Sequence, residues 1–230
     1  MKLLRLLTLL VAACLSIAAA RAAEADAKAA KAAAPKPDKD GWYQLFNGKD
    51  LAGWKLTEDN PDTFKVEDGL LVVKGERCHA FYDGPVKDHV FKNFEWKCEI
   101  MTKPKANSGM YFHSKYQADG WPAVGIEVQV NNTHPDPRKT ASLYRIKDVM
   151  DHSPAKDNEW FTQHVIVEGN HIEVKVNDKV VNEYTQPENF EREEGWEKNV
   201  ISPEGGTFVI QGHDPESEIH YRKIMVKPLP

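Results

Sequence analysis

The chain has 230 residues, of which 41% are hydrophobic and 28% charged, so it can form one sizeable hydrophobic core but not a second full domain. Its formal net charge is -5 and its Lys and Arg residues form no cluster, which argues against a nucleic-acid partner, because phosphate binding needs concentrated positive charge. The sequence also has no glycine-rich phosphate-binding loop.

The N-terminus is typical of a secretory signal. Lys2 and Arg5 precede an apolar run that ends in small residues near Ala20, so we predict a signal peptide over residues 1–22. The run is too short and too alanine-rich to remain as a membrane span. An alternative is a lipid anchor at Cys14, because residues 11–14 resemble a lipobox. Both interpretations predict an exported protein, periplasmic or extracellular.

Residues 23–40 contain Ala, Lys, Asp, Glu and two Pro but no large hydrophobic residue, and this composition predicts a flexible linker. If Cys14 is removed with the signal, Cys78 and Cys98 remain. An even cysteine count suits an oxidising compartment, so a disulfide between them is one expectation and two unpaired buried thiols the other.

Residues 41–230 are expected to form a single β domain, because turn signals are frequent and long helical periodicity is absent. We predict an antiparallel β-sandwich, a fold in which the outer face of one sheet often binds ligands. The predicted strands, in chain order, are residues 42–46, 53–56, 63–66, 70–73, 91–101, 106–113, 125–131, 142–146, 160–168, 172–176, 180–181, 207–211 and 219–226.

Two of these strands organise the candidate site. In residues 125–131, hydrophobic Ile126, Val128 and Val130 alternate with polar residues, and a strand sends successive side chains to opposite faces of its sheet. Residues 106–113 alternate in the same way. Placed side by side, the two strands would present a floor of Tyr, His, Glu, Gln and Asn side chains, which we take as the working hypothesis for the site.

The order of several motifs resembles the 3-keto-disaccharide hydrolase domain family over roughly Gly41 to Leu229. The motifs are Gly41-Trp42, Leu45 to Leu51, Gly53-Trp54, Val66 to Gly69, Asn107-Ser108-Gly109, Glu127-Val128-Gln129, and Gly206 to Gln211 followed by His213. The resemblance implies an antiparallel jelly-roll sandwich of the concanavalin-A-like lectin/glucanase type. It also implies an exported enzyme that acts on small carbohydrates, namely glycosides already oxidised to a ketone at carbon 3.

The residues themselves suggest how such a substrate could be cleaved. Retaining glycosidases usually need two carboxylates about 5–5.5 Å apart, whereas the face that carries Glu127 carries the amide Gln129 two residues later. A 3-keto sugar removes that need, because the ketone acidifies the C2 hydrogen. One base could abstract this proton, elimination would release the leaving group from C1, and water addition would complete a net hydrolysis.

This mechanism needs a general base, hydrogen-bond donors to an enolate oxygen and an acid for the leaving alcohol. As catalytic residues we expect Glu127 or His113 as the base and His213 or Tyr144 as the acid. The expected substrate-binding residues are Asn107, Gln129, Gln211, Trp121 and Tyr116. The sequence has no close-spaced metal-ligand motif, although Glu127, His113 and His213 could converge on a divalent cation.

Two other functions are compatible with the sequence. The first is a non-catalytic, lectin-like carbohydrate-binding module, because the same sandwich and aromatic loops suit sugar binding without chemistry. The second is an interaction domain that the Ala-Lys-Pro linker attaches to a cell surface. Glu127 together with Gln129, Gln211 and His213 favours the enzyme.

Overall fold

The computed structural model describes residues 34–230, which form two antiparallel sheets. The strands are β1 (Tyr43–Gln44), β2 (Trp54–Leu56), β3 (Phe64–Glu67), β4 (Leu70–Lys74), β5 (Cys78–Tyr82), β6 (Phe94–Thr102), β7 (Asn107–Ser114), β8 (Ile126–Asn131), β9 (Phe161–Glu168), β10 (His171–Val176), β11 (Lys179–Thr185), β12 (Thr207–Gly212) and β13 (Glu218–Pro228). Two short 3₁₀ helices, η1 (Pro61–Thr63) and η2 (Val86–His89), interrupt the loops. The predicted sandwich is confirmed.

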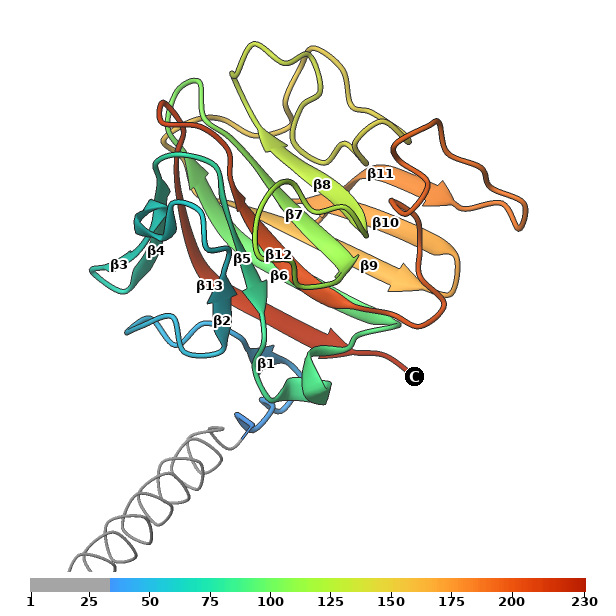
Figure 1. Cartoon of the computed structure of the whole chain (residues 1–230), viewed down its shortest axis with the longest axis horizontal. Coiled ribbons are helices and arrows are strands. Elements are labelled where there is room, and N and C mark those ends of the chain that lie inside the picture. The colour runs from blue at the N-terminus through green and yellow to red at the C-terminus, as the bar shows by residue number, and fades with distance from the viewer. Residues whose placement is uncertain (1–33) are drawn as a thin grey trace, which may run out of the picture. The chain divides into compact units, whose positions relative to one another are not determined.

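The larger sheet has the order β11-β10-β9-β6-β13-β4-β3, with β1 paired to β13, and the smaller sheet has the order β2-β5-β12-β7-β8. Figure 1 shows the sheets one over the other, with β7, β8 and β12 drawn over β6, β9 and β10. In the smaller sheet, β12 lies between β5 and β7 although it follows them by about a hundred residues or more. The site strands are therefore neighbours through long-range pairing.

The core lies between the two sheets. Trp96 of β6 stacks on Phe208 of β12 with 4.4 Å between ring centroids, and Phe94 meets Phe112 edge-on at 5.7 Å. All four side chains are fully buried, and burying each large apolar side chain stabilises the fold by roughly 2–3 kcal/mol. We call the opposite face of the five-stranded sheet, which points away from this core, its outer face.

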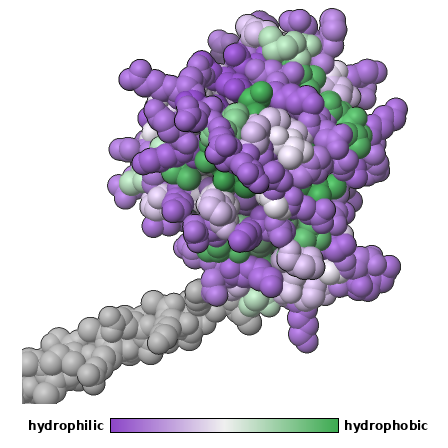
Figure 2. All heavy atoms as spheres, turned by 90° about the vertical axis from the view of Figure 1, so that its right-hand side faces the viewer, coloured by the Kyte–Doolittle hydropathy of each residue, from purple (hydrophilic) through white to green (hydrophobic). Residues whose placement is uncertain are grey.

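Hydrophilic residues predominate on the domain surface that Figure 2 shows, with hydrophobic residues scattered among them. On the eight-stranded sheet many of the surface charges are paired across strands. Glu99 of β6, for example, accepts from Arg222 at 2.6 Å and from Lys223 at 2.5 Å. These paired charges are typical of a solvated sheet face, where each exposed ion pair contributes little.

Three secondary-structure predictions need correction. Residues 142–146 form turns and isolated bridges instead of a strand, because Ala141 and Arg145 take positive φ angles of 74° and 59° that break extended geometry. The predicted strand 180–181 extends over all of β11. Strand β5 was not predicted at all; its five residues are buried on both faces, so it shows no alternation of polar and apolar residues.

Cys78 and Cys98 are both buried free thiols, so the expectation of a disulfide is wrong and the alternative of two unpaired thiols is confirmed. Burial raises the pKa of each thiol, and that of Cys98 most strongly, which keeps both protonated.

The predicted signal peptide and Cys14 lie outside the described residues. Within the linker predicted over residues 23–40, Asp38 already belongs to the folded domain, since its backbone and side chain both bond Trp42. The described part of the chain has no helix with the length and hydrophobicity of a membrane span.

Candidate active site

Three strands of the smaller sheet build the floor of a pocket on its outer face. Strict alternation buries Ile126, Val128 and Val130 of β8 in the core and turns Glu127 and Gln129 outward. The pairing register of the strands places Tyr111 of β7 opposite Glu127 of β8 on one side and opposite Val209 of β12 on the other. The predicted polar floor is therefore present, with Tyr111 at its centre.

The pocket above this floor has a volume of about 250 Å³, and we call it the Glu127 pocket. It is lined by Asn107, Tyr111, Trp121, Pro122, Glu127, Gln129, Asp136, Tyr144, Trp196, Gln211 and His213. Seven of the nine residues that the sequence analysis proposed thus line one cavity. They come from three strands and the loops between them.

Gly109 explains why the Asn107-Ser108-Gly109 motif belongs to this site. A Cβ atom at position 109 would lie 2.9 Å from Cδ of Glu127, closer than real Cβ contacts. Glycine therefore leaves the space that the Glu127 carboxyl occupies. Ser108 points the other way, where its hydroxyl donates to the backbone carbonyl of Gln211 at 2.6 Å and lies 2.7 Å from the Tyr221 hydroxyl. The motif thus joins the pocket floor to the core.

Glu127 is held in an environment that favours its protonated form. Burial raises its pKa to about 8, and the negative charges of Asp136 and Asp148 act in the same direction. Hydrogen bonds from Tyr111 and Gln211 partly oppose the shift; Gln211 Nε2 lies 3.2 Å from Glu127 Oε1. A carboxyl with a pKa near neutrality, open to a pocket, can both accept and return a proton.

His213 and Asp214 form a second acid–base pair at the edge of the pocket. Nδ1 of His213 lies 2.8 Å from Oδ2 of Asp214, so Nε2 is the ring nitrogen that a ligand would meet. Burial works against the ionised form of Asp214, but hydrogen bonds from Ser217 and His213 prevail and hold its pKa below the usual value. A carboxylate that orients a histidine in this way is suited to proton transfer.

Two amide side chains on the floor have buried oxygen atoms with no partner among the described residues: Oε1 of Gln129 and Oε1 of Gln211. Their Nε2 groups are occupied, since Gln129 donates to Asn107 at 2.6 Å and Gln211 to the Tyr111 hydroxyl at 2.6 Å. An unpaired buried acceptor costs about 1–3 kcal/mol. A ligand that is rich in hydroxyl groups would supply the missing donors.

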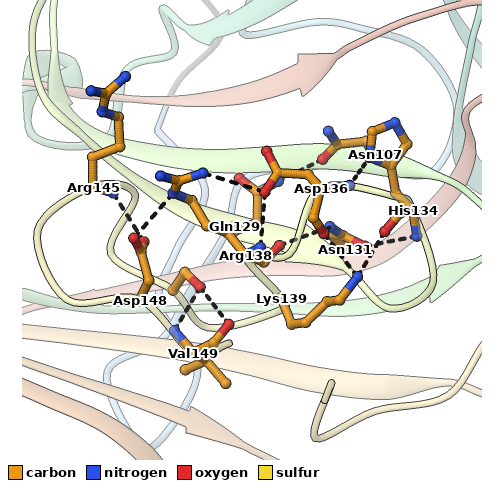
Figure 3. A network of polar contacts seen from close by, with 11 residues as sticks. Asn107, Gln129, Asn131, His134, Asp136, Arg138, Lys139, Arg145, Asp148 and Val149 are labelled. Atoms are coloured by element: carbon orange, nitrogen blue, oxygen red, sulfur yellow. Dashed lines mark hydrogen bonds and ion pairs between the residues drawn. The ribbon is translucent and has the colours of Figure 1, made fainter. Parts of the chain in front are cut away.

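The loop after β8 forms one wall and is held rigidly (Figure 3). Asn131 donates to the carbonyls of Asp136 and Arg138, at 3.0 and 2.7 Å, and Lys139 donates to those of His134 and Asp136, at 2.7 and 2.8 Å. These bonds fix the loop so that Asp136 lines the pocket.

Arg138 extends the same wall. It pairs with Asp148 at 3.0 Å, and its guanidinium lies 5.0 Å from the ring centre of Tyr144. The Tyr144 ring in turn lies 5.7 Å from that of Trp196. Burial, Asp136 and Glu127 raise the pKa of Tyr144, so its hydroxyl stays protonated and can donate a proton.

Trp121 forms the opposite rim. Its side chain is 46% exposed, and its ring lies 5.2 Å from that of His213 and 5.5 Å from that of His79. Exposed indole faces next to hydrogen-bonding groups are typical of sugar-binding sites, because a pyranose ring can stack on them. Trp121 therefore has the position that the sequence analysis expected.

His113 does not reach the Glu127 pocket, which corrects its assignment as a candidate base. Its φ angle is 54°, so the strand alternation fails here and the side chain turns elsewhere. Nδ1 accepts from the Ser202 amide at 3.1 Å, and Nε2 lies 3.0 Å from the Lys92 carbonyl. Burial lowers the pKa of His113 to about 4. His113 is therefore neutral and links the segments that contain Lys92 and Ser202.

Tyr116 also lies outside the Glu127 pocket. Its ring packs edge-on against Phe81 at 5.3 Å and lines a separate cavity, while Lys55 lies 3.6 Å above the ring centre. Glu127, His113 and His213 do not converge, because His113 is turned away from the Glu127 pocket. Residues 34–230 contain no group of three or more His, Cys, Asp or Glu residues placed to hold a metal ion.

Asp136 and Trp196 also line the pocket, from long loops without regular periodicity, and were not predicted as site residues. Tyr111 was predicted on the polar floor but without a role. His79, a fully buried histidine on β5 that pairs with Gln211 in register, was not predicted. The alternation of residues along β7 could have predicted a role for Tyr111. No local sequence pattern distinguishes the two loop residues, Asp136 and Trp196.

The chain is 28% identical over 172 residues to the 3-keto-disaccharide hydrolase of Bacteroides thetaiotaomicron, a match that covers 64% of this chain and 59% of that protein's length. A solved structure from Parabacteroides distasonis, provisionally named a glycosyl hydrolase, has a TM-score of 0.70 at 22% identity and covers 83% of this chain and 95% of that one.

A solved endo-β-1,3(4)-glucanase of glycoside hydrolase family 16 has a TM-score of 0.50 at 13% identity and covers 84% of this chain and 92% of that one. These structural similarities confirm the predicted concanavalin-A-like sandwich. At the level of sequence, the model of the 3-keto-alpha-glucoside-1,2-lyase-like domain matches residues 41–227, nearly the whole described chain. The chain therefore belongs to the 3-keto-alpha-glucoside-1,2-lyase-like domain family.

Proposed function

We propose that this protein is an exported enzyme that cleaves the glycosidic bond of 3-keto glycosides, with Glu127 as the general base. The observation that carries the proposal is a pocket-floor carboxyl, Glu127, whose pKa is raised and whose neighbours on the floor are amides and a tyrosine. The pocket's other carboxyl, Asp136, comes from the loop after β8 and is paired with Arg138 at 3.5 Å. Such a site suits the removal of one activated proton better than a displacement that needs a nucleophile and an acid.

In the first step, ionised Glu127 removes the proton from C2 of the sugar. The C–H electron pair moves into the carbonyl system and forms an enolate at the C3 oxygen. The floor provides donors close to the carboxyl, in particular the Tyr111 hydroxyl and Nε2 of Gln211. Hydrogen bonds that strengthen as negative charge develops stabilise the transition state.

In the second step, the enolate expels the leaving group: the bond between C1 and the glycosidic oxygen breaks and a C1–C2 double bond forms. The departing oxygen takes a proton from His213 or Tyr144, which line the other side of the pocket. Water then adds its oxygen to C1 and gives one proton to the residue, His213 or Tyr144, that protonated the leaving group, while a proton returns to C2 from Glu127. The sum is hydrolysis, and every proton removed is replaced.

The first experiment measures product release from a 3-keto aryl glucoside and from the corresponding ordinary glucoside with the purified full chain. We expect turnover of the keto substrate only, and a loss of about a hundredfold or more in Glu127→Gln, as for removal of a general base. Glu168→Gln, which changes an exposed carboxyl at the end of β9 in the other sheet, is the matched control and should keep full activity. Unchanged turnover in Glu127→Gln would remove this residue from the mechanism.

A second experiment tests the elimination step. Single-turnover rates with a substrate deuterated at C2 should be lower than with the unlabelled substrate, because the bond from C2 to hydrogen breaks before the leaving group departs. Equal single-turnover rates for the two substrates would indicate direct displacement at C1. Saturable sugar binding with no product from any keto glycoside would support the lectin-like alternative instead.

Export of the protein is supported by the sequence pattern of residues 1–22. The check is the N-terminal sequence of the protein recovered from cell fractions. A mature chain that starts after Ala20 or Ala22 supports a cleaved signal, whereas a lipid-modified chain that starts at Cys14 supports the anchor. Recovery of the intact N-terminus in the cytoplasm would contradict both.

A further inference from the structure

A second cavity lies on the outer face of the same five-stranded sheet and has no part in the chemistry above. Its volume is about 310 Å³, larger than that of the Glu127 pocket. We call it the Phe81 pocket; Phe81, Tyr82, Val90, Ser114 and Tyr116 are among its lining residues. Its lining therefore includes the aromatic residues Phe81 and Tyr82 of β5 and Tyr116 of the loop after β7, together with the aliphatic Val90 that follows η2.

The two pockets are adjacent along one row of paired residues. Phe81 of β5 pairs with Val209 of β12, and Val209 pairs with Tyr111 of β7. These three side chains form a separate apolar cluster on the outer face, apart from the core. Neighbouring strands lie about 4.8 Å apart, so two steps separate the Phe81 and Tyr111 backbones by roughly 10 Å. The two pockets therefore flank one row of side chains, with the buried Val209 between them.

The Phe81 pocket differs in chemistry from its neighbour. The Glu127 pocket offers several buried amide groups with unpaired oxygens, which suit the many hydroxyls of a sugar. In the Phe81 pocket two buried polar atoms lack a hydrogen-bond partner among the described residues: Oγ of Ser114, which is 1% exposed, and Nδ1 of His89, which lies 3.6 Å from a carboxylate oxygen of Asp83. The charged residues Asp83, Lys115 and Glu204 are exposed at the rim.

A second pyranose in this pocket would bury hydroxyl groups opposite rings that cannot bond them, at a cost of about 1–3 kcal/mol for each unpaired group. A flat aromatic ring would instead pack against the exposed side chains of Tyr116 and Val90, which are 37% and 49% accessible, beside the buried ring of Phe81. One hydroxyl on that ring could bond Oγ of Ser114.

We propose that the Phe81 pocket binds the aglycone of the substrate and that this aglycone is a hydroxylated aromatic ring, with the sugar held in the Glu127 pocket. The proposal deepens the proposed function and rests on it. Phenolic glycosides are then the substrate class, and oligosaccharides are poor substrates. Tyr116 takes part in substrate binding as the sequence analysis expected, but through the aglycone.

The first test compares turnover of 3-keto glucosides that carry a 6-hydroxy-2-naphthyl or a methyl aglycone. Val90→Asp places a charge in the Phe81 pocket at a largely exposed position, so the fold should tolerate it. We expect kcat/KM for the naphthyl substrate to fall by about tenfold or more, with the methyl substrate unchanged within about twofold. Val180→Asp, equally exposed on β11 of the other sheet, should change neither value.

The second test is independent of catalysis. Binding of 2,6-dihydroxynaphthalene, followed by NMR titration, should weaken about fivefold or more in Val90→Asp and more modestly in Ser114→Ala, but not in Val180→Asp. Equal turnover of both substrates by Val90→Asp and wild type, with unchanged naphthalenediol binding, overturns the aglycone proposal. If no keto glycoside is cleaved but the diol binds in a Val90-dependent way, the proposed function fails and the aromatic site stands.

Discussion

Replacing Glu127 by Gln should make the protein more stable and inactive at the same time. Burial raises the pKa of this carboxyl from 4.5 to about 8. Each pKa unit corresponds to about 1.4 kcal/mol, so at pH 7 the full shift would cost the folded state about 3 kcal/mol. The side chain is part-exposed at the pocket floor, and solvent screening should reduce the cost to roughly 1–2 kcal/mol.

The sign of this effect with pH follows from the raised pKa. Below pH 4.5 the carboxyl is protonated in the folded and unfolded chains, and Glu127 costs nothing. Between pH 4.5 and about 8 the unfolded chain releases the proton while the folded chain keeps it, so stability falls as the pH rises. Glutamine has the same shape but does not ionise, and the variant avoids this loss.

Urea denaturation at pH 5, 7 and 8.5 measures the difference. The gain in unfolding free energy of Glu127→Gln over wild type should be small at pH 5 and should grow with pH, while the exposed control Glu168→Gln should show no such growth. A gain that stays flat with pH, or a variant less stable than wild type at pH 8.5, would refute the argument that Glu127 is held protonated by its surroundings.

Three further predictions concern the same sheet. Gly109→Ala should push the Glu127 carboxyl aside and lower kcat/KM by about tenfold or more, while circular dichroism shows an unchanged fold. The kcat/KM of the wild type should rise with pH and level off above about 8, because the base must be ionised; a rate that falls over this range would exclude Glu127 as the base. His113→Gln should cost about 1–3 kcal/mol in urea denaturation but leave kcat unchanged, since His113 bonds loops outside the pocket. Because burial lowers the pKa of His113 to about 4, wild-type stability should fall as the pH drops from 6.5 towards 4, and this loss should be smaller in His113→Gln.

Local alternation was enough to predict most of the floor. Glu127 and Gln129 were placed on one face because hydrophobic residues occupy the alternate positions of β8, and Gln211 and His213 shared a parity on the segment around β12. The period of two is a property of the extended backbone itself, so it can be read from a short stretch of sequence. Alternation fails at His113. This residue has a positive φ angle and bonds two loops, so its side chain does not lie on the face of the sheet that alternation predicts.

By itself, the sequence determined a β-sandwich and which residues of each strand face away from its core. Only the tertiary structure decided that β12 lies between β5 and β7, that the loops bring Asp136 and Trp196 over the floor, and that Cys78 and Cys98 stay apart. The physical reason is range: side-chain alternation is set by neighbouring residues, whereas strand order and loop position depend on contacts between segments far apart in the chain.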